Sequence, residues 1–152
     1  MRVGELAPNF SLPDHENRVR SLRDLLENKK FLILYFYPKD DTPGCTKEAC
    51  GFRDLLNEIR GMNGDVVGIS VDDARSHQSF SKKYSLGFTL LTDSKGEVAR
   101  LFDSFSEEKG RCLRKTFVID EKGRVIGAFE EIKAEDHPLR ALEYVKEKIG
   151  RG

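Results

Sequence analysis

Two cysteines, Cys45 and Cys50, stand five positions apart in the segment Thr-Pro-Gly-Cys-Thr-Lys-Glu-Ala-Cys. Thr42 is a favourable N-cap and Pro43 suits the first helical position, so the segment predicts a helix with Cys45 in its first turn. Unpaired backbone N–H groups and the positive end of the helix dipole favour the thiolate there, which is the reactive form of sulfur. The pattern indicates thiol redox chemistry; the alternative is two ordinary helix cysteines, one packed and one incidental.

The two cysteines face different sides of this predicted helix. Cys45 shares the apolar side with Ala49 and Phe52, whereas Cys50 is about 140° further around the axis, on the wetter side with Asp54. Cα atoms five residues apart on an ideal helix are separated by about 8.7 Å, and a disulfide tolerates less than roughly 7 Å. If the two cysteines form a bond, we expect a helical reduced form and a locally unfolded oxidised form.

The elements around this helix follow from the hydrophobic pattern. The segment 31–37 is apolar throughout, which is typical of a central strand covered on both faces. A hairpin is expected near the N-terminus, followed by a short helix that Ser21 and Asp24 would cap. Further strands are expected at 65–71, 88–91, 116–120 and 124–129, and further helices from 72 or 73 to 84, around 98–102 and from 137 onward, the last with Leu139, Leu142, Val145 and Ile149 inward.

This order predicts a thioredoxin-like α/β fold, with a mixed central sheet flanked by helices and a short N-terminal hairpin. We find no repeat or linker, and expect one domain over residues 1–152. In open sheets of this kind the functional site lies beyond the carboxyl ends of the strands. The loop 38–45 follows such an end, so the predicted site lies there.

Charge and apolar patterning narrow the classes of partner. The 152 residues include 26 basic and 26 acidic side chains, for a formal net charge of +0, which argues against nucleic acid or an acidic membrane as partner. No apolar run approaches the roughly 20 residues of a membrane span, and the N-terminus lacks the apolar core of a secretory signal. We therefore expect a cytoplasmic protein, whose three cysteines are reactive, metal-bound or inert rather than a permanent disulfide frame.

The cysteine segment resembles the signature of the peroxiredoxins, Pro-x-x-x-Thr-x-x-Cys, which stands here as Pro38-Lys-Asp-Asp-Thr42-Pro-Gly-Cys45. The second cysteine five residues later is similar to the bacterioferritin comigratory protein subfamily, also called PrxQ. The likeness covers essentially the whole chain. It includes Gly4-Glu-Leu-Ala-Pro-Asn-Phe10 near the start and Arg114-Lys-Thr-Phe-Val-Ile-Asp120 towards the end.

The resemblance implies an atypical 2-Cys, thioredoxin-dependent peroxidase that acts on hydrogen peroxide and organic hydroperoxides. Cys45 would be the peroxidatic cysteine, which is oxidised to a sulfenic acid. Cys50 would be the resolving cysteine, forming an intramolecular disulfide that a thioredoxin-type dithiol reduces. No cofactor is implied, because sulfur is the redox centre, and a monomer is expected with a dimer as the alternative.

The resemblance also assigns the residues around the sulfur. Thr42 would donate its hydroxyl to the peroxide, and Arg114 would pair with the thiolate and donate to the peroxide. Pro38 would shield the sulfur, and the backbone N–H groups of Gly44 and Cys45 would complete the pocket. Without the motif, Arg114 would be a surface charge in a basic loop.

Several other polar residues have weaker assignments. We expect Glu48 to support the helix dipole or a polar network rather than to transfer a proton, and Tyr37 to pack beside the site. Cys112 is expected to be incidental, with a regulatory or intermolecular disulfide as the alternative. The histidines show no metal-ligand spacing and are expected at the surface or as caps: His15, His77 and His137.

Two other classes of function compete with the peroxidase. A general thiol–disulfide oxidoreductase usually carries two residues between its cysteines, whereas this chain has four. A non-enzymatic redox-sensing or metal-binding module would use Cys45, Cys50 and Cys112. A zinc site usually needs four ligands with short paired spacings, which the sequence lacks.

Overall fold

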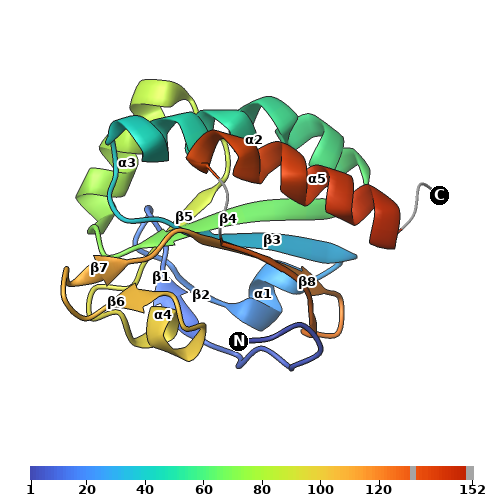
Figure 1. Cartoon of the computed structure of the whole chain (residues 1–152). Coiled ribbons are helices and arrows are strands. Elements are labelled where there is room, and N and C mark those ends of the chain that lie inside the picture. The colour runs from blue at the N-terminus through green and yellow to red at the C-terminus, as the bar shows by residue number, and fades with distance from the viewer. Residues whose placement is uncertain (131–132, 150–152) are drawn as a thin grey trace.

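The computed structural model describes residues 1–130 and 133–149. Its central sheet has five strands in the order β5-β4-β3-β8-β9. Helices cover both faces of this sheet (Figure 1). The strands are β1 Ser11–Pro13, β2 Val19–Ser21, β3 Phe31–Phe36, β4 Gly64–Ser70, β5 Thr89–Thr92, β6 Phe105–Ser106, β7 Arg111–Cys112, β8 Lys115–Asp120 and β9 Val125–Phe129. The helices are α1 Leu22–Leu26, α2 Pro43–Gly61, α3 Ala74–Tyr84, α4 Glu97–Leu101, the 3-10 turn Ala134–Asp136 and α5 His137–Lys148.

The sheet is mixed in the predicted way. β3 pairs in parallel with β4, and β4 with β5, so α2 and α3 are the crossover helices between parallel strands. β8 runs antiparallel to both β3 and β9, and the last two strands of the sheet form a hairpin before α5. β1 and β2 form the expected N-terminal hairpin. The thioredoxin-like fold class is therefore confirmed.

The side chains of β3 divide between two hydrophobic cores because successive residues of a strand point to opposite faces. Phe31, Ile33 and Tyr35 pack in the core beneath α2, α3 and α5. Leu32 and Leu34 pack in the second core, beneath α1 and α4. In Figure 1 these two layers lie above and below the sheet. The strand that leads into the cysteine segment is thus buried from both sides, as its composition predicts.

The start of α5 lies directly against α2. A Cβ added at Gly51 would stand 2.7 Å from Cγ of Pro138, closer than real Cβ contacts come. Only glycine therefore lets the two helices approach at this point. Gly51 follows Cys50 in the chain, so the contact begins where the cysteine segment ends.

Several local predictions are confirmed, one is wrong, and one small element was missed. Ser21 and Asp24 form the expected capping box of α1, and Asp73 caps α3. Leu139 was expected to face inward from α5, but it is 54% exposed, because the buried side of this helix runs through Ala141, Leu142 and Val145. The small β6–β7 hairpin was not expected, since each of its strands has only two residues and carries no periodic signal. None of the described helices is both long and apolar enough to cross a bilayer.

Candidate active site

Cys45 lies in the first turn of α2, just beyond the carboxyl end of β3. Thr42 is the N-cap and Pro43 begins the helix, as expected. The first backbone hydrogen bond of the helix runs from Thr46 N to the Thr42 carbonyl oxygen at 2.8 Å. The N–H groups of Gly44 and Cys45 come before this bond and have no acceptor within the helix. Cys45 is 1% exposed and packs on the core side of the helix. The predicted inward orientation of this sulfur is confirmed.

Among the described residues, the cationic side chain of Arg114 reaches the buried sulfur. The Nη2 atom of Arg114, on the residue before β8, lies 3.4 Å from the Cys45 Sγ atom. Its Nη1 atom donates to Oε1 of Glu48 at 2.6 Å. The guanidinium is held against the helix start, since a Cβ at Gly44 would lie 3.2 Å from Nη2. Arg114 therefore stabilises negative charge on the sulfur, and its fork-shaped group can bind both partners at once.

Glu48 is fully buried one helical turn from Cys45. Burial raises the pKa of its carboxyl group to about 8, although the neighbouring Arg114 works in the opposite direction. Its second oxygen, Oε2, has no hydrogen-bond partner among the described residues and lies 3.9 Å from Nδ1 of His137. The expected polar network around Glu48 is present, and this residue fixes the far side of the guanidinium.

The raised pKa of Glu48 predicts a pH-dependent stability. The folded protein keeps the Glu48 proton up to about pH 8, whereas the unfolded chain releases it near 4.5. The folded state then binds more protons in this interval, so stability falls as the pH rises through it. The stability of Glu48→Gln, measured by thermal unfolding, should lack this pH dependence. Between about pH 5 and pH 8 the free energy of unfolding of wild type should fall by on the order of a few kcal/mol relative to the variant.

The matched control for this prediction is Glu58→Gln, on the exposed side of the same helix. Its stability curve should keep the pH dependence of wild type. Parallel curves for wild type and Glu48→Gln would show that Glu48 is ionised in the folded protein throughout the range.

Thr42, Gly44 and Pro38 lie in or next to the loop that enters α2. All three are half-buried. The Thr42 hydroxyl donates to the Lys39 carbonyl oxygen at 3.0 Å. The expected donor role therefore needs revision, because the hydroxyl hydrogen is used inside the loop and the oxygen keeps lone pairs for a substrate hydrogen.

The other two cysteines differ in accessibility. Cys50 is half-buried on α2, as expected for the wetter side of the helix, and all three cysteines are free thiols. Cys112 lies on β7 and is 2% exposed. Burial, with Asp93 and Asp72 nearby, raises the pKa of its thiol to about 12. The structure thus favours the assignment of Cys112 as an inert packing residue.

A polar network that the sequence did not predict lies beside the site, and two histidines lie elsewhere than expected. His77 and His137 are completely buried, not at the surface. Tyr37 is buried as expected, and its hydroxyl contacts Asp40 at 2.5 Å and His77 Nδ1 at 3.3 Å. A signal was available: His77 lies three residues before Phe80, on the apolar face of a short amphipathic helix.

Asp40, Asp72 and His77 are the one group of three His, Cys, Asp or Glu side chains in 1–130 and 133–149 with donor atoms close enough for a single ion. It contains no cysteine. His77 Nδ1 and Asp40 Oδ2 are 2.7 Å apart, which is a direct hydrogen bond. Asp72 Oδ2 already accepts from the Asp40 N–H and the Ser70 hydroxyl. These atoms bind one another, so the group is a hydrogen-bond network.

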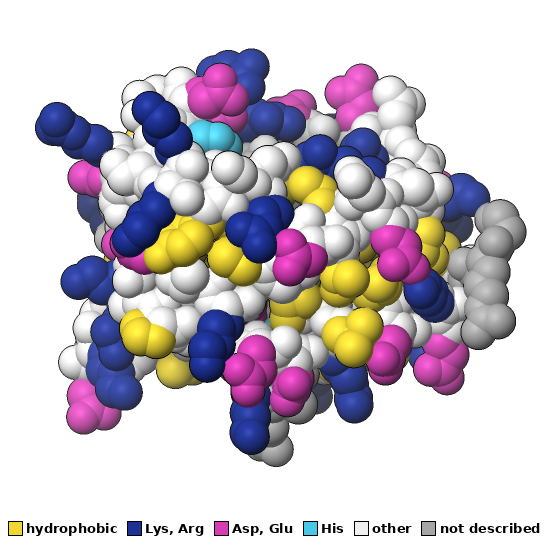
Figure 2. Space-filling model, turned by 90° about the horizontal axis from the view of Figure 1, so that it is seen from above, with side chains coloured by type: hydrophobic (Ala, Val, Ile, Leu, Met, Phe, Trp, Pro, Cys, Tyr) yellow, Lys and Arg dark blue, Asp and Glu magenta, His cyan; other side chains and the backbone are white. Residues whose placement is uncertain are grey.

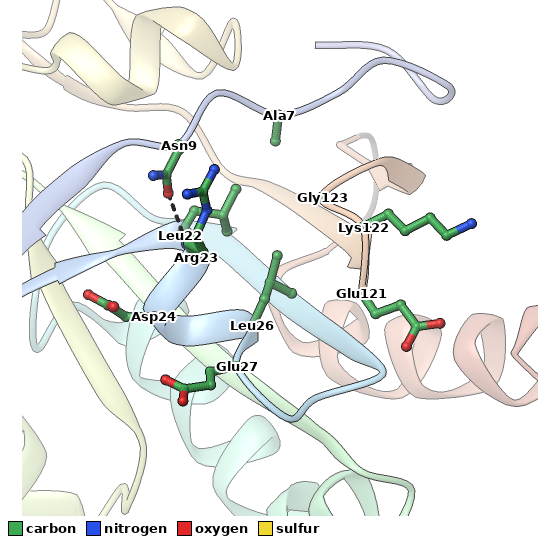
Figure 3. A pocket seen from close by; sticks show the side chains of 10 residues that line it. All are labelled: Ala7, Asn9, Leu22, Arg23, Asp24, Leu26, Glu27, Glu121, Lys122 and Gly123. Carbon is green, nitrogen blue, oxygen red and sulfur yellow. Dashed lines mark hydrogen bonds between the residues drawn. The ribbon is translucent and has the colours of Figure 1, made fainter.

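A surface pocket of the described part of the chain lies away from the cysteines. This pocket, on the α1 side of the sheet, is lined by residues of α1, the N-terminal segment and the β8–β9 turn (Figure 3). None of the predicted site residues lines it. On the face that carries α2 and α5, acidic and basic side chains are interspersed, with no large patch of one sign (Figure 2).

Comparison with known proteins places this geometry in a family. The AhpC/TSA family model matches residues 3–128. A putative peroxiredoxin bcp of Coxiella burnetii is 43% identical, with 99% of this chain and 98% of that protein covered. The crystal structure of peroxidoxin BcpB from Mycobacterium tuberculosis superposes with a TM-score of 0.92 at 35% identity, covering 100% of this chain and 99% of that one. The bacterioferritin comigratory protein of Xanthomonas campestris has a TM-score of 0.86 at 29% identity, over 97% and 98% of the two chains.

The chain belongs to the AhpC/TSA family. Within that family it is a peroxiredoxin of the bacterioferritin comigratory protein or PrxQ group, and hence a thiol-dependent peroxidase. The general oxidoreductase and the non-enzymatic sensing module are therefore set aside as its primary function.

Proposed function

We propose that Cys45 is the peroxidatic cysteine and Cys50 the resolving cysteine of this peroxidase. The Cys45 thiolate attacks one peroxide oxygen, the O–O bond breaks, and the other oxygen takes a proton and leaves as water or an alcohol. The resulting sulfenic acid reacts with the Cys50 thiol to give a disulfide and water. A thioredoxin-type dithiol then reduces that disulfide and is itself oxidised.

The observation that carries this proposal is the contact between Arg114 and Cys45 at the start of α2. The guanidinium lies 3.4 Å from the sulfur and is held from behind by the buried Glu48. A cation placed there favours the thiolate and can donate to the oxygen on which negative charge develops. Arg53 lies within electrostatic range of Cys50, but among the described residues only Cys45 is hydrogen-bonded to a cationic side chain.

The remaining residues of the site have supporting roles in this proposal. The Gly44 and Cys45 N–H groups bind the peroxide oxygen under attack, since they precede the first bond of the helix. The Thr42 oxygen accepts the hydrogen of the peroxide, because its own hydrogen is engaged with Lys39. Pro38, half-buried in the same loop, shields the sulfur from bulk water. Together these groups align the O–O bond with the sulfur.

The disulfide step requires α2 to open at its start. The helix is continuous from Pro43 to Gly61 while the cysteines are free thiols. In a regular helix their Cα atoms are about 8.7 Å apart, beyond the reach of a disulfide. The Cys45–Cys50 bond therefore forms only with the first turns of α2 unwound.

The experiment that tests the proposal is limited trypsin digestion of the reduced protein and of protein oxidised with one equivalent of hydrogen peroxide. Lys47 lies in the segment that must unwind, so cleavage after it should be at least about tenfold faster after oxidation. Mass analysis of the same digest should find the peptides on either side of Lys47 joined by a Cys45–Cys50 disulfide, with Cys112 still a thiol.

The same digest contains internal control cleavage sites. Cleavage after Arg75 and Lys82, on α3, should be equally slow in both samples, because α3 does not take part in the change. Equal protection of residues 42–55 in the two redox states, or a disulfide that includes Cys112, would contradict the proposed resolution step.

We further propose that both hydrogen peroxide and organic hydroperoxides are substrates. The Xanthomonas campestris relative is described by its alkyl peroxide reduction activity. We also propose that the protein acts as a monomeric, single-domain enzyme over residues 1–152 in the cytoplasm, without a bound cofactor, nucleic acid or membrane partner. The balanced charge of the chain supports the last part of this proposal.

A further inference from the structure

The loop between β3 and α2 is tied to its surroundings by one buried carboxylate, that of Asp40. Its side chain is only 3% exposed. The Tyr37 hydroxyl donates to Oδ1 at 2.5 Å, the Ser76 hydroxyl donates to Oδ2 at 2.8 Å, and Nδ1 of His77 lies 2.7 Å from Oδ2. Ser76 and His77 belong to α3, so these contacts fasten the active-site loop to a neighbouring helix. We call these four residues the Asp40 clasp.

Both ring nitrogens of His77 have hydrogen-bond partners. Its Nε2 atom lies 3.1 Å from the carbonyl oxygen of Leu91, which can only accept, so Nε2 carries a hydrogen. Its Nδ1 atom faces the Asp40 carboxylate, which also accepts. Burial, followed by the charge of Asp40, raises the pKa of Tyr37 well above its ordinary value, so Tyr37 remains a donor. His77 therefore bridges the Leu91 carbonyl oxygen and the Asp40 carboxylate and holds that carboxylate in place.

The clasp reaches the active site through a single peptide group. The Asp40 N–H donates to Oδ2 of Asp72 at 2.9 Å. The carbonyl of the same peptide, that of Lys39, accepts the Thr42 hydroxyl at 3.0 Å. Because a peptide group is planar, holding its N–H and the adjoining Asp40 side chain also fixes the direction of its carbonyl. The carbonyl then determines where the Thr42 hydroxyl hydrogen points, and hence where its lone pairs lie.

We propose that His77 is a positioning residue for peroxide reduction, which acts through Asp40 and the Lys39–Asp40 peptide to aim the Thr42 oxygen at the peroxide. This inference rests on the proposed function of Thr42. The thiolate itself depends on Arg114, which comes from the other side of the site, next to β8. Loss of His77 therefore impairs the reaction with peroxide and leaves the general reactivity of the thiolate largely intact.

The test is His77→Gln. The glutamine side chain has no second ring nitrogen, so it cannot reach both Leu91 and Asp40 as the histidine ring does. Two rates are measured on the reduced protein, well below its melting temperature: the reaction of Cys45 with hydrogen peroxide, and its alkylation by iodoacetamide. The peroxide rate should fall about tenfold to a hundredfold, because misplacement of one binding group has effects of this size. The alkylation rate should change by less than about twofold.

Lys83→Met is the matched control. Lys83 also joins α3 to the loop, through Asp41 at 2.8 Å, but this ion pair is exposed. Exposed pairs contribute little, so both rates should stay within about twofold of wild type. If His77→Gln does not fold, Tyr37→Phe and Ser76→Ala each remove one bond to Asp40 with little change in volume, and each should show the same selective loss of the peroxide rate.

The route through Thr42 is tested by a double variant. The double variant Thr42→Val/His77→Gln should react with peroxide less than about twofold more slowly than Thr42→Val alone, because the two changes remove the same interaction. Equal losses in the peroxide and alkylation rates, or a full second loss in the Thr42→Val background, would overturn the proposal. A Thr42→Val variant as fast as wild type would instead refute the role of Thr42 in the proposed function, and with it the route of this inference.

Discussion

Cys45→Ser is expected to abolish peroxidase turnover. The substitution removes the nucleophile, and a serine hydroxyl beside Arg114 does not reduce an O–O bond. Loss of the nucleophile of a covalent mechanism lowers the rate by about four orders of magnitude or more. The measurement is consumption of hydrogen peroxide with a thioredoxin system as the electron source, at equal concentrations of folded protein.

Cys112→Ser is the control for this prediction. Cys112 is buried in the second core with a strongly raised pKa, so the change should cost some stability and leave the rate per folded molecule within about twofold. Sustained turnover in Cys45→Ser would falsify the assignment of the peroxidatic cysteine, whatever the behaviour of the control.

Cys50→Ser is expected to separate the two halves of the cycle. The Arg114 contact with Cys45 does not involve residue 50, so the first reaction with peroxide should proceed at a rate within a few fold of wild type. One equivalent of peroxide should be consumed per chain, and the sulfenic acid should accumulate and be trapped by dimedone on the Cys45 peptide. Thioredoxin-supported recycling should fall to background, because no intramolecular disulfide forms.

The double variant Cys50→Ser/Cys112→Ser tests for a substitute resolving thiol. It should behave as Cys50→Ser does, since Cys112 is buried and its thiol stays protonated. Recycling that persists in Cys50→Ser and disappears in the double variant would assign resolution to Cys112 instead.

The architecture could be predicted from the sequence because its signals are local and agree with one another. The uninterrupted apolar run at residues 31–36 predicted a central strand, and the Thr-Pro pair predicted the first turn of α2. The same reasoning placed Cys45 inward and Cys50 on the wetter side. The prediction for Leu139 was wrong because this residue lies about 120° around the helix axis from Val145, which is near the middle of the buried face.

The surroundings of the site could be predicted only in part. Motif resemblance singled out Arg114, but its contact with Glu48 joins residues 66 positions apart, and no local pattern shows such a pairing. The same holds for Asp40 and His77, which the fold brings together from two different crossover segments. The direction of the Thr42 hydroxyl could not be predicted either, because it depends on a neighbouring carbonyl in an irregular loop.

The close approach of Gly51 to Pro138 has a consequence for the working cycle. It marks the boundary at which the start of α2 comes under the cover of α5, one residue beyond Cys50. Opening that ends at this boundary leaves Phe52, Leu56 and Ile59 seated in the core. The start of α2 can then unfold and refold at every catalytic cycle while the packing of the rest of the molecule stays unchanged.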